Sequence, residues 1–237
     1  MYVKGLDGRA LKTYEKTIEM GDNNRAFVMD GKNDTTTYWS YWHDYVGGTV
    51  EFEVDVSDVG CECAASAFLV QLNDENCSWN SYERDSVPQC SRIELMESNI
   101  WGFNVASYPC EFGECEATSA SQTSAWDIDS MAYGPGSDNT IDTTKPYSVK
   151  TQFYAEVDAE GTKGGLLRIE TCLIQGDNMI TLKQDHADYM TTLRDKLEWR
   201  MAMGVSSYHV GLENDIAGTC SETCESSNMI IHNLRFT

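Results

Sequence analysis

The chain has 237 residues, of which 41% are hydrophobic, and 38 acidic against 17 basic residues give it a formal charge of -21. That charge repels phosphate backbones and anionic lipid, so we expect no nucleic-acid partner. No stretch approaches the about 18 consecutive apolar residues typical of a membrane span, so we expect no membrane insertion. The apolar content is enough for a core, and we expect one domain over residues 1–237.

Nine cysteines accompany only four histidines, a ratio that favours disulfides in an oxidising compartment over metal binding. Residues 1–5 do not resemble a secretory leader. We therefore expect a secreted or cell-surface protein whose leader is absent from this sequence; an intracellular protein with reduced cysteines is the alternative. Asn33 and Asn76 begin Asn-x-Ser/Thr sequons and are candidate glycosylation sites.

Alternating patterns predict β-strands in the first half of the chain. Val50, Phe52, Val54 and Val56 alternate with acidic residues, which places the four apolar side chains on one face of a strand. Residues 67–72 are apolar except for Gln71, which is typical of a strand covered on both faces.

The second half shows the same alternation. Across residues 147–157, the side chains at the odd positions are apolar except for Thr151, and they alternate with Ser148, Lys150, Gln152 and Glu156. A strand over residues 167–173 would turn Leu167 inward and Glu170 outward. Residues 229–236 are interpreted as a final strand.

One segment has apolar residues at helical spacing, namely Met190, Leu193, Leu197 and Met201. Asp188 can cap its start, so we predict one short helix near residues 188–199, followed by a strand over residues 200–205. There is no linker and no repeat. The fold class predicted from these patterns is all-β, one antiparallel domain of two packed sheets.

Several segments together resemble glycoside hydrolase family 7, the retaining cellulases. The segments are residues 47–57 with Cys61 after them, the Tyr-Gly-Pro-Gly-Ser turn at residues 133–137, residues 141–145 and residues 151–153. The resemblance covers roughly residues 25–237 and implies a concanavalin-like jelly-roll β-sandwich. The chain is far shorter than a cellulase of that family. The missing length falls in loops that roof the family's substrate tunnel, so we expect any cleft to be open.

The family carries its chemistry on one strand with the pattern Glu-x-Asp-x-x-Glu: nucleophile, assisting Asp and acid/base. The matching stretch here is residues 92–99, and Tyr-Pro-Cys at residues 108–110 follows where the family has His-Pro-Cys. By this resemblance Glu97 takes the acid/base position and Glu94 the place of the assisting Asp. Arg92 stands where the nucleophile belongs.

The chemical consequence of Arg92 is large. Retaining hydrolysis uses two carboxyl groups about 5–5.5 Å apart, one of which attacks the sugar, and a permanently charged guanidinium cannot attack. Arg92 precedes Glu94 by two residues and therefore lies on the same strand face, so its guanidinium would pair with the Glu94 carboxylate. The substitution at Tyr108 removes a further family histidine. We therefore expect the retaining mechanism to fail.

Two other interpretations of this strand stay open. A bulge could bring Glu94 and Glu97 to one face, where they could act as an inverting pair at the low end of the about 6.5–9.5 Å separation that inversion requires. Alternatively, Arg92, Glu94 and Glu97 form an ion-pair ladder with no chemistry.

Aromatic rings are candidate sugar platforms because they cover the apolar faces of pyranose rings. The rings within residues 38–45 alternate along the chain, so most of them are expected to pack in the interior. The residues that we expect to contact a polysaccharide are Arg92, Asn99, Trp101, Tyr108, Trp126 and Tyr208. The four histidines lack paired ligand spacing, and we expect no metal and no cofactor.

The resemblance also implies disulfides. It matches Cys61 with Cys220, which favours a second, adjacent bridge between Cys63 and Cys224; a four-thiolate zinc site is the alternative for these four cysteines. It further pairs Cys77 with Cys90, ahead of the strand that carries Arg92. The resemblance also suggests a bridge between Cys115 and Cys172, which would leave Cys110 as the odd cysteine without an intramolecular disulfide partner.

These observations predict a secreted, cellulase-like protein without retaining catalysis. It would bind a polysaccharide of the β-glucan type, or serve as a structural part of an assembly with other extracellular glycoprotein chains. The alternative function is an active endo-β-1,4-glucanase that uses Glu94 and Glu97.

Overall fold

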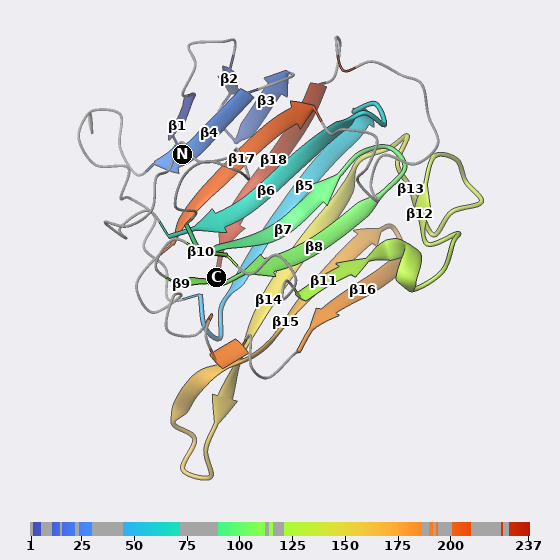
Figure 1. Ribbon diagram of the computed structural model, residues 1–237. Helices are drawn as coiled ribbons and strands as arrows, with labels where there is room; N and C mark the ends of the chain where they lie inside the picture. The colour runs from blue at the N-terminus through green and yellow to red at the C-terminus, as the bar shows by residue number, and fades with distance from the viewer. Residues whose placement is uncertain are drawn as a thin grey trace.

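Two antiparallel sheets of seven strands each pack face to face in the computed structural model of the protein (Figure 1). We call them the front sheet and the back sheet. The structure describes residues 2–5, 11–14, 16–21, 24–29, 45–71, 90–111, 114–115, 121–185, 190–191, 193, 201–209, 224 and 228–237. The expected all-β sandwich of two antiparallel sheets is confirmed.

The front sheet has the order β1 (Tyr2–Gly5), β4 (Asn24–Met29), β17 (Ala202–His209), β6 (Cys63–Val70), β7 (Arg92–Ser98), β8 (Phe103–Tyr108) and β11 (Ser121–Ser124). The back sheet has the order β16 (Asn178–Gln184), β15 (Lys163–Gln175), β14 (Tyr147–Val157), β5 (Thr49–Asp58), β18 (Asn228–Phe236), β3 (Thr17–Gly21) and β2 (Leu11–Tyr14). Short elements complete the described chain: the pair β9 (Cys110–Glu111) and β10 (Glu114–Cys115), the pair β12 (Tyr133–Gly134) and β13 (Ile141–Asp142), and the 3-10 helix η2 (Ala125–Asp127).

The core lies between the two sheets and follows the predicted alternation. All four apolar residues predicted for one face of β5 are buried there. β14 coincides with the predicted residues 147–157, and β18 contains the predicted final strand. β6 is buried on both faces along its whole length, as the apolar run predicted. Its outer face, which points away from the back sheet, is therefore covered.

The prediction for Leu167 is wrong. Tyr154 of β14 pairs with Arg168, whereas its neighbour Ala155 pairs with Leu166, so Leu167 is the extra residue of a bulge. Leu166 is buried in the core and Leu167 is exposed. A bulge shifts every later side chain to the other face, and strict period-two counting cannot detect it.

The predicted helix near residues 188–199 is described at Met190, Thr191 and Leu193, which are helical. Its other positions lie outside the described residues. The strand predicted over residues 200–205 is β17, which extends to His209.

One predicted disulfide is present, joining Cys63 at the start of β6 to Cys224, 161 residues later. This disulfide links the front sheet covalently to the segment that precedes β18. Cys61 and Cys90 are also disulfide-bonded. The residues predicted as their partners, Cys220 and Cys77, lie outside the described residues, as do the sequon residues Asn33 and Asn76.

The predicted bridge between Cys115 and Cys172 is wrong. Cys172 is a free thiol on β15, the second strand of the back sheet, where it faces outward beside the Thr181 hydroxyl at 3.4 Å. Cys115 lies opposite Cys110 in the β9–β10 ladder, which follows directly from β8 of the front sheet. The two cysteines therefore belong to different sheets.

Candidate functional site

The candidate site residues gather on the outer face of the front sheet, along β7. Arg92 and Glu94 face outward because the residues after each of them pack in the core. Adjacent residues of β6 oppose Glu94 and Met96, so Leu95 is the extra residue of a bulge. Leu95 and Met96 both enter the core. The bulge thereby returns Glu97 to the outer face beside Glu94, the arrangement that the sequence left open.

Arg92 and Glu94 form the predicted ion pair. The distance from Arg92 Nε to Glu94 Oε1 is 3.1 Å, and the Ser66 hydroxyl of β6 donates to Glu94 Oε2 at 2.6 Å. The Arg92 guanidinium lies 4.3 Å from the centre of the Tyr108 ring, its directly opposed residue on β8. Both carboxylate oxygens of Glu94 are thus engaged, and the side chain is only 1% exposed.

Burial dominates the electrostatics of Glu94. Loss of hydration raises the pKa of its carboxyl group from 4.5 to about 7, and the nearby Glu97 carboxylate acts in the same direction. The positive charges of Arg92 and Arg25 and the hydrogen bond from Ser66 lower the pKa without outweighing burial. Burial therefore favours the protonated form of Glu94 more strongly than at an exposed glutamate.

Glu97 is held from the other side by Tyr208. The Tyr208 hydroxyl of β17 donates a hydrogen bond to Glu97 Oε1, reaching across the intervening strand β6. The residues of β6 that lie opposite Tyr208 and Glu97 are Ala64 and Ser66, which are small enough to allow that reach. Tyr208, which the sequence named as a ligand contact, thus also positions a carboxylate.

An apolar cluster adjoins the charged residues on the same face. Phe27 and Phe68 pack edge to face with their ring centres 6.2 Å apart, and Val70 and Cys90 complete a buried group. Gly204 lies between the two rings, because a Cβ atom there would stand 2.5 Å from Phe68. This part of the outer face is closed. The half-buried polar side chains described beside it include Arg25, Arg92, Glu97, Tyr108 and Tyr208.

Asn99 has a different role from the predicted ligand contact. Its side chain is fully buried, and its Oδ1 accepts the backbone N–H groups of Trp101 at 2.8 Å and Gly102 at 2.9 Å. Its Nδ2 donates to the Cys61 carbonyl at 3.2 Å. Asn99 therefore shapes the turn between β7 and β8, and its amide is not free for a sugar.

Trp101 and Trp126 are exposed, as ligand contacts would be, but neither lies on a strand. Trp101 occupies the β7–β8 turn and Trp126 lies in η2. Both are at the end of the front sheet, beyond Glu97.

Sequence reasoning missed Ser66 and Arg25. Ser66 is the one hydroxyl in the apolar strand β6, which is a weak signal for a buried acceptor opposite it. Arg25 belongs to β4, and its approach to Glu94 arises from the order of four strands. No local pattern could have revealed it.

Within the described ranges, no three or more His, Cys, Asp or Glu side chains converge as metal ligands would. No helix in the same part of the chain is long and apolar enough to cross a membrane.

No protein-family model and no curated protein matches the chain. Solved structures do. An endoglucanase I in complex with cellobiose is similar with a TM-score of 0.72 and 15% identity, over 95% of this chain and 77% of that one. A family 7 cellobiohydrolase from Daphnia pulex has a TM-score of 0.71 and 14% identity, over 95% and 79%. A cellobiohydrolase from Melanocarpus albomyces in complex with cellotetraose has a TM-score of 0.68 and 14% identity, over 96% and 79%. These likenesses confirm the expected fold, the jelly-roll sandwich of family 7 cellulases.

Proposed function

We propose that the protein binds a β-glucan chain on the outer face of the front sheet without cleaving it. The observation that carries the proposal is the ion pair between Arg92 and Glu94, in which a guanidinium occupies the position expected for the attacking carboxylate. Two structurally similar proteins were solved with cellobiose and cellotetraose, which supports a glucan as the ligand class.

The geometry of the pair disfavours a double displacement. An arginine cannot attack an anomeric carbon. The carboxylate that pairs with Arg92, that of Glu94, is buried, and both of its oxygens are engaged. Within β7, Glu97 is the accessible carboxylate, and by itself it does not complete a retaining pair.

The accessible groups suit a neutral, hydroxyl-rich ligand. The half-buried ring of Tyr208 offers an apolar face to a pyranose ring, and the Tyr108 ring carries the Arg92 guanidinium over one of its faces. Arg92 and Glu97 offer a donor and an acceptor for sugar hydroxyls. A neutral glucan also avoids the repulsion that the net charge of -21 imposes on polyanions.

Binding and cleavage can be tested in one pair of experiments. Calorimetry with cellotetraose should detect binding that weakens at least about tenfold, or about 1.4 kcal/mol, in Tyr108→Ala. Tyr154→Ala is the matched control, because Tyr154 also packs under an arginine but lies on the outer face of the back sheet. Absence of binding in the unaltered protein, or an equal loss in both variants, would contradict the proposal.

Hydrolysis by Glu94 and Glu97 is the second candidate function. Two observations favour it: the bulge brings both carboxyl groups to one face, and burial raises the pKa of Glu94 to about 7, which suits a general acid. This candidate predicts reducing ends released from soluble β-glucan and abolished by Glu97→Gln. The binding proposal predicts no release, and cellotetraose affinity that survives Glu97→Gln.

We further propose that the protein is secreted. The Cys63–Cys224 disulfide supports an oxidising compartment. A role as a structural component beside other extracellular glycoprotein chains is compatible with glucan binding and would appear as a large buried contact with another chain.

A further inference from the structure

Four large apolar side chains are exposed at the end of the front sheet: Trp101 at 45%, Trp126 at 57%, Ile128 at 47% and Met131 at 46%. We call them the platform. The segment that contains Trp126, Ile128 and Met131 follows directly after β11, whose last residue, Ser124, pairs with Asn104 at the start of β8. Trp101 lies in the turn that leads into β8, so strand pairing brings the two parts of the platform to the same end of the sheet.

Side-chain caps hold the backbone under the platform. The Asn99 Oδ1 atom anchors the N–H of Trp101, and the Ser124 hydroxyl accepts the N–H of Trp126 at 3.2 Å. Asp127 completes that cap by accepting the N–H of Ser124 at 2.9 Å. The Asp129 carboxylate accepts the N–H of Met131 at 2.9 Å. These exposed side chains therefore stand on a braced surface, not on a free loop.

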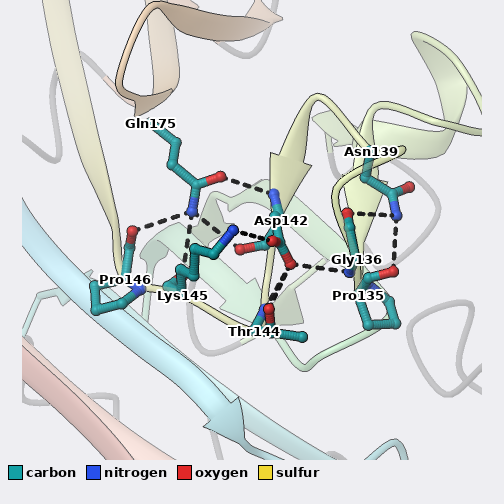
Figure 2. A network of polar contacts seen from close by, with 8 residues as sticks. All are labelled: Pro135, Gly136, Asn139, Asp142, Thr144, Lys145, Pro146 and Gln175. Carbon is teal, nitrogen blue, oxygen red and sulfur yellow. Dashed lines mark hydrogen bonds and ion pairs between the residues drawn. The ribbon is translucent and has the colours of Figure 1, made fainter.

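A polar network braces the chain that follows the platform, as Figure 2 shows. The Asp142 carboxylate accepts hydrogen bonds from the Gly136 N–H at 2.9 Å and the Thr144 hydroxyl at 2.6 Å, and it pairs with Lys145 at 2.7 Å. These donors, led by Lys145, hold the pKa of Asp142 well below its usual range. Gln175 of β15 accepts from the Asp142 N–H at 2.8 Å and donates to its carbonyl at 3.0 Å. The loop after Met131 is thereby tied to the back sheet.

We infer that the platform binds the face of an insoluble, uncharged polysaccharide, separately from the single chain on the front sheet. The inference rests on the proposed function, because it assigns the same ligand class to a second surface. Exposed apolar side chains held on a braced backbone at one end of a sheet mark a binding surface, and indole rings cover sugar rings.

Charge selects among the possible occupants. Asp127 and Asp129 flank the platform, and the chain carries a net charge of -21, so a polyanion or an anionic lipid surface would be repelled. A second copy of the chain carries the same charge and is disfavoured for the same reason. A flat neutral glucan surface meets apolar side chains without either penalty.

The test compares two ligands and two variants. The platform variant combines Ile128→Ser with Met131→Ser, and the control is Met179→Ser, whose side chain is 59% exposed on the back sheet. Binding to microcrystalline cellulose is measured by sedimentation, and binding to cellotetraose by calorimetry. We expect the platform variant to bind cellulose at least about tenfold more weakly while its cellotetraose affinity is unchanged, and Met179→Ser to match the unaltered protein in both assays.

The outcomes separate the two proposals. Cellulose binding that is absent from the unaltered protein, or unchanged in the platform variant, would overturn the platform. A dimer that the same variant dissociates, or capture of a cationic protein in place of cellulose, would also overturn it. Loss of cellulose binding in the platform variant, with no cellotetraose binding by any form, would support the platform and contradict the front-sheet site.

Discussion

The two outer faces of the sandwich carry the same three-residue arrangement. On the front sheet, Arg92 pairs with Glu94 at 3.1 Å and lies 4.3 Å from the centre of the opposed Tyr108 ring. On the back sheet, Arg168 pairs with Glu170 at 2.9 Å and lies 3.9 Å from the centre of the opposed Tyr154 ring.

The environments of the two glutamates differ. Burial raises the pKa of Glu94 to about 7. Burial also acts to raise the pKa of Glu170, but the hydrogen bonds and charges of Arg168, Tyr154 and Lys183 outweigh it, and that pKa is lowered. An Arg-x-Glu pair on one strand face is therefore an ordinary feature of an exposed sheet. Burial and the neighbouring residues Ser66, Glu97 and Tyr208 distinguish the front-sheet arrangement from the back-sheet arrangement.

Replacing the arginine of each arrangement should give the largest difference in stability between the front-sheet and back-sheet variants. Arg92→Ala leaves the buried Glu94 without its cation, which we expect to cost about 3–5 kcal/mol of unfolding free energy at pH 8. The loss should be smaller at pH 5, because protonation then neutralises Glu94. Arg168→Ala exposes its partner to water and should cost far less. Urea unfolding at both pH values measures the difference; equal losses in the two variants would show that burial does not distinguish them.

The two glutamates should respond to pH in opposite directions. Glu94 has a folded-state pKa above its unfolded value of 4.5, so its contribution to stability is fully present below pH 4.5 and is lost as pH rises through about 7. That loss amounts to roughly 3 kcal/mol. Glu170 has a lowered pKa, so its contribution is present above pH 4.5 and is lost as pH falls.

Stability curves of Glu94→Gln and Glu170→Gln test this opposition. Glu94→Gln should remove the decline between pH 4.5 and 7, and Glu170→Gln should reduce the decline on the acid side. The same pH dependence in both variants would refute the assignment.

A glycine substitution sharpens the comparison of packing. Gly204→Ala on the front sheet would drive a Cβ atom against the Phe68 ring, which is enclosed by Phe27, and should cost about 1–3 kcal/mol. Gly164→Ala on the back sheet meets the Glu156 Cβ atom at 3.0 Å in an exposed hairpin and should cost less. Thermal unfolding of the two variants provides the measurement. A well-tolerated alanine at position 204 would mean that the outer face of the front sheet is loosely packed.

Much of the fold was predictable, because alternation and specific motifs report it directly. The even alternation of β5 and β14 predicted their buried faces, and the turn at residues 133–137 carried the resemblance to a jelly roll. Leu167 failed because a bulge breaks the alternation without changing composition. The predicted Cys115–Cys172 disulfide was wrong because disulfide pairing depends on which sheet each strand joins.

The site was predictable along its strand and not across the sheet. The pairing of Arg92 with Glu94 follows from two-residue spacing on one strand. The hydrogen bonds from Ser66 to Glu94 and from Tyr208 to Glu97 depend on the order of β17, β6 and β7, which no local pattern contains. The predicted ligand contact of Asn99 was wrong because a side-chain amide can bond the backbone of a turn as readily as it can bond a ligand.

The most direct test of the central claim is to follow cellotetraose and the protein together by calorimetry and mass spectrometry. We expect saturable binding, a cellotetraose mass that stays unchanged over prolonged incubation, and no covalent sugar adduct on any carboxylate. Release of shorter sugars that stops in Glu97→Gln, or a trapped glycosyl-protein adduct, would contradict it.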